Sequence, residues 1–160
     1  MDNHLVSQYL YQSKELFGNT LFLENKINDI NFYELGDITS EITIIKFHFS
    51  HKDEQIIFSK ILKALNLSEE KIYILDCLNS NIKKDKKFKS LISQLNSKII
   101  ITLGLDISQF LLDSNENLEI LRRKKNFFKE INVIPTYSIN DIRTNLSLKR
   151  NLWNDLKVIL

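Results

Sequence analysis

Four short runs of apolar and β-branched residues alternate with amphipathic stretches from residue 41 onward. The runs are ITIIKFHF (42–49), KIYIL (71–75), SKIIITLG (97–104) and INVIPTY (131–137). Runs that are apolar on both alternations are typical of strands covered on two faces, as in parallel sheets. Strands that alternate with helices predict an α/β fold: a mainly parallel, four-stranded sheet between two helical layers, with right-handed crossovers.

The stretches between these runs have the spacing of amphipathic helices. The first is predicted to begin at Asp53, and Asp106 is the expected N-cap of the third. Ser138 is expected to cap a helical turn from Ile139 to Arg143. The expected inward-facing residues are Ile56, Ile57, Ile61, Leu62 and Leu65 in the first helix, Phe88, Leu91, Ile92 and Leu95 in the second, and Leu148, Leu152, Leu156 and Ile159 in a closing helix (147–160), with Trp153 beside them.

The N-terminal part of the chain has a different pattern. Residues 4–17 place apolar side chains near helical spacing, and Gly18 with Asn19 then indicates a helix end. Residues 21–35 are mixed and are expected to be extended or irregular. We therefore predict two parts, an N-terminal arm with a helix and linker (1–35) and a single α/β domain (36–160).

Composition excludes several classes of protein. The chain of 160 residues, 43% hydrophobic and 26% charged, is sufficient for one globular domain with a core. No apolar stretch is long enough for a membrane span and the start lacks signal-peptide features, so we expect a cytoplasmic location. A net charge of +2 does not by itself indicate nucleic-acid binding. The single cysteine, Cys77, permits no internal disulfide or multi-cysteine metal site and is expected to be buried at a strand end; no cofactor is expected.

Two segments resemble motifs of the uracil-DNA glycosylase superfamily. IIITLGLDISQFLL is similar to its strand–helix motif, and IPTYSINDIRTNLSLKRNLWNDLKVI is similar to its C-terminal motif. The resemblance covers roughly residues 41–160 and implies a three-layer α/β/α fold. The residues in register with the C-terminal motif are Pro135, Thr136, Tyr137, Arg143, Asn145, Lys149, Arg150, Trp153, Asp155 and Leu156.

The catalytic parts of that superfamily are missing. In the glycosylases the first strand opens into a Gly-Pro-rich loop that activates water and frames the flipped base. Here FHFSHKDEQ passes from strand to helix in about three residues, which we expect to leave too little room between Phe49 and Asp53 for a base-holding cavity. Ser138, a neutral donor, replaces the histidine of the final motif. We interpret His48 and Ser138 as degenerate active-site positions.

Among relatives without this chemistry, the chain is most similar to the psi subunit family of bacterial DNA polymerase III. The similar segments are QYL in the arm, ILKALNLSEEKI, and DIRTNLSLKRNLW, in which Leu146 stands where proline is usual. The resemblance implies a non-catalytic accessory subunit for DNA replication. Its arm would bind the clamp-loader gamma/tau subunits, and its body would bind the chi subunit, which links it indirectly to single-stranded DNA-binding protein and DNA.

The arm contains large apolar side chains suited to this binding. Aromatic and large aliphatic residues carry most interface energy, and an amphipathic helix can lie in a partner's groove. The expected anchors are Tyr9, Leu10, Leu16, Phe17, Leu21 and Phe22. Packing of the same helix on the protein's own sheet is the alternative.

Two other functions remain open. The first is a divergent uracil or mismatch DNA glycosylase, with His48, His51 or Asp106 in new roles. The second is a nucleic-acid-binding module on the same fold. The sequence does not distinguish which face would bind a partner, or the oligomeric state.

Two basic runs, KKDKKFK (83–89) and RRKK (122–125), bear on the nucleic-acid-binding alternative. Proteins that bind single-stranded nucleic acid interleave basic residues with aromatic side chains on which bases stack. The nearby aromatic residues are Phe88, Phe127 and Phe128. Helical spacing points Phe88 inward, so the first run is interpreted as a solvated face. Residues 116–130 have no clear period, so we expect a hairpin or a loop there.

Overall fold

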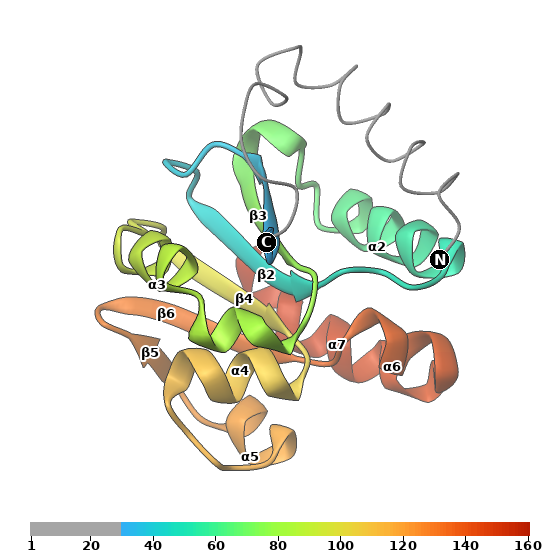
Figure 1. Ribbon diagram of the computed structural model, residues 1–160. Coiled ribbons are helices and arrows are strands. Elements are labelled where there is room, and N and C mark those ends of the chain that lie inside the picture. The colour runs from blue at the N-terminus through green and yellow to red at the C-terminus, as the bar shows by residue number, and fades with distance from the viewer. Residues whose placement is uncertain (1–29) are drawn as a thin grey trace. The chain divides into compact units, whose positions relative to one another are not determined.

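The structure is a computed structural model, and it describes residues 30–160. The chain divides into two units, Met1–Ile30 and Asn31–Leu160, and the second contains a mixed α/β fold (Figure 1). The predicted arm helix and the six expected anchor residues lie outside the described residues. The α/β class predicted from the sequence is confirmed.

A six-stranded mixed sheet forms the centre of the second unit. Its strands are β1 (Phe32–Gly36), β2 (Ile42–Phe47), β3 (Ile72–Cys77), β4 (Ile99–Leu103), β5 (Asn126–Phe128) and β6 (Ile131–Thr136). Their order is β1-β3-β2-β4-β6-β5. The four strands predicted from the sequence, β2, β3, β4 and β6, run parallel to one another. The expected number of four strands is too low, because β1 and β5 add antiparallel edges.

The register of the parallel strands aligns their apolar side chains in rows. Ile44 lies opposite Ile74 on one side and Ile101 on the other, and Ile101 lies opposite Ile134. Because side chains at the same register point to the same face, these four isoleucines form one continuous strip. A slip of one residue in any of these strands would move its isoleucine to the opposite face and interrupt the strip, so the pattern specifies the pairing.

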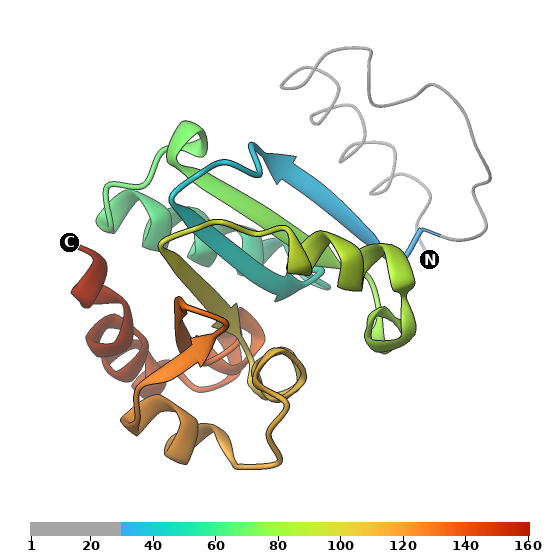
Figure 2. The ribbon, with the colours of Figure 1, turned by 90° about the vertical axis from the view of Figure 1, so that its left-hand side faces the viewer.

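Helices cover both faces of the sheet. They are α2 (Lys52–Ala64), α3 (Lys86–Ser93), α4 (Leu105–Leu112), α5 (Leu118–Arg123), α6 (Ile139–Thr144) and α7 (Lys149–Leu156). Short 3₁₀ turns are η2 (Glu69–Lys71), η3 (Ser80–Lys84), η4 (Leu146–Leu148) and η5 (Lys157–Ile159). Figures 1 and 2 show α2 and α3 on opposite sides of the strands.

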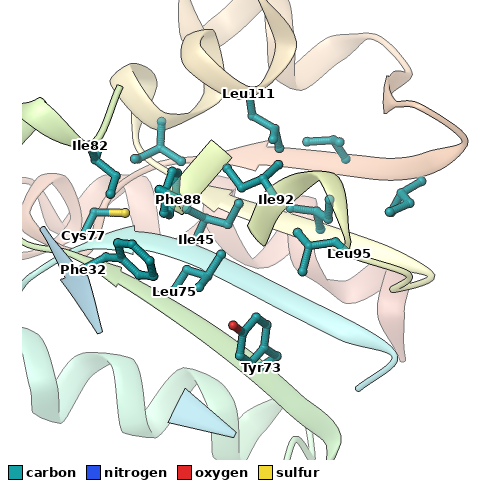
Figure 3. Packing of buried hydrophobic residues seen from close by; sticks show 14 residues of the cluster. Phe32, Ile45, Tyr73, Leu75, Cys77, Ile82, Phe88, Ile92, Leu95 and Leu111 are labelled. Carbon is teal, nitrogen blue, oxygen red and sulfur yellow. The ribbon is translucent and has the colours of Figure 1, made fainter. Parts of the chain in front are cut away.

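One buried cluster lies under α3 and α4 (Figure 3). Phe88 of α3 makes an edge-to-face contact with Phe32 of β1, with ring centroids 5.1 Å apart. Cys77 is buried at the end of β3, as predicted, and burial raises the pKa of its thiol to about 12. The second cluster lies on the opposite face, against α2, α6 and α7.

Two expectations about the helices are wrong. Ile56 is exposed, and Phe58 takes an inward position on α2 instead. Asp106 lies in the first turn of α4 and does not cap it, because the N-cap position is held by Gly104. Gly104 has φ +108°, a conformation that glycine tolerates and side chains rarely adopt.

Residues 116–130 form a short helix and a hairpin, one of the two expected outcomes. Helix α5 is followed by β5, which pairs antiparallel with β6. The buried amide of Asn126 donates hydrogen bonds to the carbonyl oxygens of Leu121 and Lys124, which ties the hairpin to the helix end. Lys129 makes the turn with φ +53°. Polar side-chain contacts such as these are not visible as an apolar period in the sequence.

The closing helix is confirmed, but Trp153 is not buried. The helical run consists of η4, α7 and η5, with Leu152 and Leu156 buried and Leu148 and Ile159 half-buried. Trp153 is 38% exposed.

No helix within residues 30–160 is long and apolar enough to cross a bilayer.

The exposure of Trp153 sets the expected effect of its removal. Trp153→Ala is expected to destabilise the protein by about 1–2 kcal/mol, less than the ~3–5 kcal/mol typical of a fully buried tryptophan. Urea unfolding followed by circular dichroism would measure the loss. A loss above about 3 kcal/mol would mean that the ring is buried in solution.

Candidate functional site

The order of the parallel strands reverses between β2 and β4. The chain leaves β2 through α2 to reach β3 on one side, whereas it leaves β4 toward β6 on the other side. In open α/β sheets, ligands bind at the carboxyl ends of the strands at such a reversal. A cleft of about 250 Å³ opens there. Its lining residues are Lys46, Phe47, His48, Phe49, Ser50, Glu54, Leu103, Ser138, Ile139 and Asn140.

The expectation that this place has no room for a cavity is wrong. The connection between β2 and α2 is short, since β2 ends at Phe47 and α2 begins at Lys52. The opposite wall of the cleft comes from the segment after β6, which contains Ser138 and Asn140. The structure therefore brings to one cleft His48 and Ser138, the two residues interpreted from the sequence as degenerate active-site positions.

A buried ion pair lies at the floor of this region. Lys46 of β2 and Asp76 of β3 occupy the same register, and they are 5% and 1% exposed. The Lys46 Nζ lies 2.7 Å from Asp76 Oδ1, and His48 Nδ1 lies 2.8 Å from Asp76 Oδ2. The ammonium also lies 3.7 Å from the centre of the Phe49 ring, a cation–π contact.

Burial and pairing act in opposite directions on these two groups. Burial lowers the pKa of the Lys46 ammonium, and the charge of Asp76 opposes that change. Burial alone would raise the pKa of Asp76, but hydrogen bonds to His48 and Lys46 and the charge of Lys46 outweigh it. The net pKa of Asp76 is therefore below its usual value, and its carboxylate is ionised at neutral pH.

A second charged pair lies beside the first. The Nε of Arg143, on α6, is 3.5 Å from Oε1 of the buried Glu54, on α2. Glu54 Oε2 accepts a hydrogen bond from the backbone N–H of Ser50 at 3.3 Å. Within the described residues, Glu54 Oε1 and Arg143 Nε have no partner at hydrogen-bond geometry. The pair links the start of α2 to the segment after β6 that forms the opposite wall of the cleft.

Ser138 is the N-cap of α6, as predicted. Its hydroxyl accepts a hydrogen bond from the Asp141 backbone N–H at 3.1 Å, and the Asp141 carboxylate accepts one from the Ser138 backbone N–H at 3.0 Å. This reciprocal capping box satisfies two N–H groups at the helix start. It uses a lone pair of the hydroxyl and leaves the O–H proton, so Ser138 remains a neutral donor beside the cleft.

Several residues of the C-terminal motif form a structural clamp. Arg122 binds Asp155 through two nitrogens at 2.7 and 3.1 Å, and it donates a third hydrogen bond to the Tyr137 hydroxyl at 2.9 Å. Thr136 donates to the same carboxylate at 2.6 Å. The clamp joins α5, β6 and α7. Sequence reasoning missed Arg122, because it lies in a basic run that otherwise indicates a solvated surface.

The remaining candidates do not gather at the cleft. Asn145 caps η4 by accepting a hydrogen bond from Ser147, and the buried Pro135 lies within β6. Arg150 and Trp153 lie exposed on α7. The alternatives His51 and Asp106 are both exposed and do not line the cleft. Across residues 30–160, no group of three or more His, Cys, Asp or Glu side chains is placed to hold a metal ion.

A scan against models of known protein families finds no match for this chain, and a search of curated proteins finds none either.

The ionised Asp76 predicts a specific loss of stability in acid. Its pKa in the folded protein is below the value of about 3.9 expected in the unfolded chain, so the unfolded state binds more protons as the pH falls. The stability that Asp76 contributes is complete above pH ~4 and is lost as the pH falls through its folded pKa. Urea unfolding from neutral pH down to about pH 2.5 would measure this loss. In Asp76→Asn, the free energy of unfolding should fall less steeply as the pH is lowered below ~4. An equally steep fall in this variant would contradict the conclusion that Asp76 is ionised and stabilising in the folded protein.

Proposed function

We propose that the protein is a non-catalytic, psi-like subunit that bridges the clamp-loader collar of bacterial DNA polymerase III to a chi-type partner and single-stranded DNA-binding protein. The resemblance of its C-terminal motif to the psi family supports this proposal. The parallel strands β3, β2, β4 and β6, numbered along the chain, have the doubly wound order 2-1-3-4 with helices on both faces. This order is compatible with a four-stranded parallel core and a three-layer, uracil-DNA glycosylase-like scaffold.

The observation that carries the proposal is the use of the degenerate active site for stability. At the end of β2, where the glycosylases open a catalytic loop, Lys46 is buried against Asp76 and His48 contacts the same carboxylate. On the opposite wall, Ser138 closes a capping box. The residues at the end of β2 hold two strands together, and Ser138 starts a helix. We expect such structural roles at former catalytic positions when a scaffold is retained for binding.

The direct test is co-purification with clamp-loader subunits. The full chain is expected to elute with purified gamma/tau and chi subunits, and Tyr9→Ala with Phe17→Ala in the arm should abolish the gamma/tau interaction. Phe127→Ala is a matched aromatic substitution on an exposed strand of the body and should leave that interaction intact. Failure of the full chain to elute with either subunit at micromolar concentration would reject the proposal.

A divergent DNA glycosylase is the second candidate, and one observation favours it. The cleft is below the range of about 300–1,000 Å³ typical of drug-sized ligands, which suits a ligand as small as a single base. His48 and Ser138 both line it. Flipped bases are bound in such pockets through hydrogen bonds and stacking, and Phe49 supplies an aromatic wall.

A base-release assay distinguishes the two candidates. Labelled oligonucleotides with uracil or a mismatched base, single-stranded and duplex, are expected to remain intact after incubation with the protein and alkaline treatment. Release that disappears in His48→Ala and in Ser138→Ala would replace the binding-only proposal with the glycosylase. His51→Ala is the matched control, because His51 is exposed and lies outside the cleft lining.

A further inference from the structure

Four large apolar side chains are exposed in the C-terminal segment, Leu146, Trp153, Val158 and Leu160, and three of them recur at a fixed spacing. Leu146, Trp153 and Leu160 are 60%, 38% and 71% exposed and are spaced seven residues apart. Leu146 lies in η4, Trp153 lies in α7, and Leu160 directly follows η5, in the C-terminal segment drawn in red in Figure 2. A spacing of seven returns a side chain to nearly the same face of a helix, as in coiled coils. All three residues are exposed and none lines the cleft, so we group them as one surface stripe.

Basic side chains surround the tryptophan of this stripe. Lys149, Arg150 and Lys157 stand four and three residues before Trp153 and four residues after it, which makes them its neighbours on the helix surface. All three are exposed, and none forms an ion pair with another residue in 30–160. We call these six residues the α7 stripe: Leu146, Lys149, Arg150, Trp153, Lys157 and Leu160.

The inward face of α7 packs on the sheet. Leu152 and Leu156 are buried in the cluster on the sheet, and the only carboxylate of the helix, Asp155, is held by Arg122. The α7 stripe therefore presents apolar and cationic groups with no anion of its own helix among them. A surface of this composition is complementary to an apolar stripe with acidic flanks.

We propose that the α7 stripe is the docking surface for an acidic amphipathic helix of a protein partner. The partner's apolar residues, at heptad spacing, pack against Leu146, Trp153 and Leu160. Its Asp and Glu side chains flank these contacts and pair with Lys149, Arg150 and Lys157. The first and last apolar positions are fourteen residues apart along the chain, in a segment that contains α7 and the 3₁₀ turns η4 and η5. The proposal does not depend on the clamp-loader function.

The composition of the stripe favours a helix over single-stranded nucleic acid. Bases stack on aromatic side chains, and two of the three apolar positions here are leucines, which provide no ring. Leucines at heptad spacing are instead the pattern of one helix packing on another. Trp153 and Arg150 belong to the residue types that dominate binding energy at protein interfaces.

The test uses the intrinsic fluorescence of Trp153, because it is the only tryptophan in the chain. The probe is a synthetic amphipathic helical peptide without tryptophan, apolar at the heptad a and d positions and Glu at e and g. The control peptide carries Lys at every Glu position. With the full chain, the Glu peptide is expected to shift the emission to shorter wavelength in a saturable, salt-sensitive way, and the Lys peptide is expected to leave it unchanged.

Charge-reversal variants locate the binding. Arg150→Glu with Lys157→Glu keeps the fluorescent reporter and should weaken binding of the Glu peptide at least tenfold. Lys86→Glu with Lys87→Glu is the matched control on the exposed surface of α3 and should bind like the unmodified chain. Circular dichroism melting curves confirm that each variant is folded before titration.

Several outcomes would overturn the proposal. An unchanged emission with the Glu peptide up to millimolar concentration rejects docking of an acidic helix, and equal binding of the Lys peptide rejects charge recognition. A response to oligo-dT without one to the Glu peptide would make the stripe a nucleic-acid surface. An emission that depends on protein concentration alone would identify a second copy as the occupant. An emission that moves to longer wavelength when residues 1–22 are deleted would identify the N-terminal arm.

Discussion

Replacing Asp76 with alanine is expected to destabilise the protein by ~3–5 kcal/mol, the loss typical when one partner of a buried ion pair is removed. Lys46 would then keep its ammonium within the protein without the carboxylate that lies 2.7 Å away. His48 would lose a contact at the same time. Urea unfolding at neutral pH, followed by circular dichroism, gives the free energy of unfolding for the comparison.

Two controls separate loss of the pair from other effects. The double variant Lys46→Met with Asp76→Leu removes both charges, so it should be more stable than Asp76→Ala by ~1 kcal/mol or more. Asp106→Ala removes an exposed carboxylate from the first turn of α4 and should cost less than ~1 kcal/mol. A loss below ~1 kcal/mol for Asp76→Ala would show that Lys46 reaches solvent and that the pair does not hold β2 to β3.

The sequence predicts the parallel core well because its strands are continuous apolar runs. β2, β3, β4 and β6 all lie within the predicted segments or extend them by a few residues. The edge strands are different: β5 has only three residues, and β1, with the sequence FYELG, is not a continuous apolar run. Their antiparallel pairing depends on the neighbouring strand, and a local pattern does not contain that information.

The polar site was harder to predict, because it is made by register and not by spacing. Lys46 and Asp76 are thirty positions apart and become neighbours only when β2 pairs with β3. The cleft has the same origin. The number of residues between Phe49 and Asp53 correctly indicated a short connection. It contained no information about the opposite wall of the cleft, which is formed by the segment after β6. Only Ser138, whose capping pattern is local, was placed correctly from sequence.

The C-terminal motif has a clearer meaning once the clamp is known. Thr136, Tyr137 and Asp155 surround the side chain of Arg122, which is 10% exposed. Such residues are required wherever this scaffold must hold α7 against β6, whatever its activity. The motif therefore indicates the scaffold more strongly than it indicates a reaction.

A substitution in the core should show that α3 packs on the sheet as the structure describes. Phe88→Ala is expected to destabilise the protein by ~3–5 kcal/mol, because it removes a fully buried ring and leaves a cavity. Phe88 is 0% exposed and contacts the rings of Phe32 and Phe110. Figure 3 shows Phe88 beside Phe32 in the buried cluster. Loss of these aromatic pairs adds to the cost of the lost burial.

Phe127→Ala provides the matched comparison, because the same atoms are removed from a side chain that is 57% exposed on the edge strand β5. Its expected loss is below ~1 kcal/mol, so urea midpoints for the two variants should differ widely. Near-equal losses would mean that the basic helix containing Phe88 does not bury its apolar face. In that case the first basic run would present an aromatic residue to solvent, and its interpretation as a solvated face would give way to that of a nucleic-acid contact.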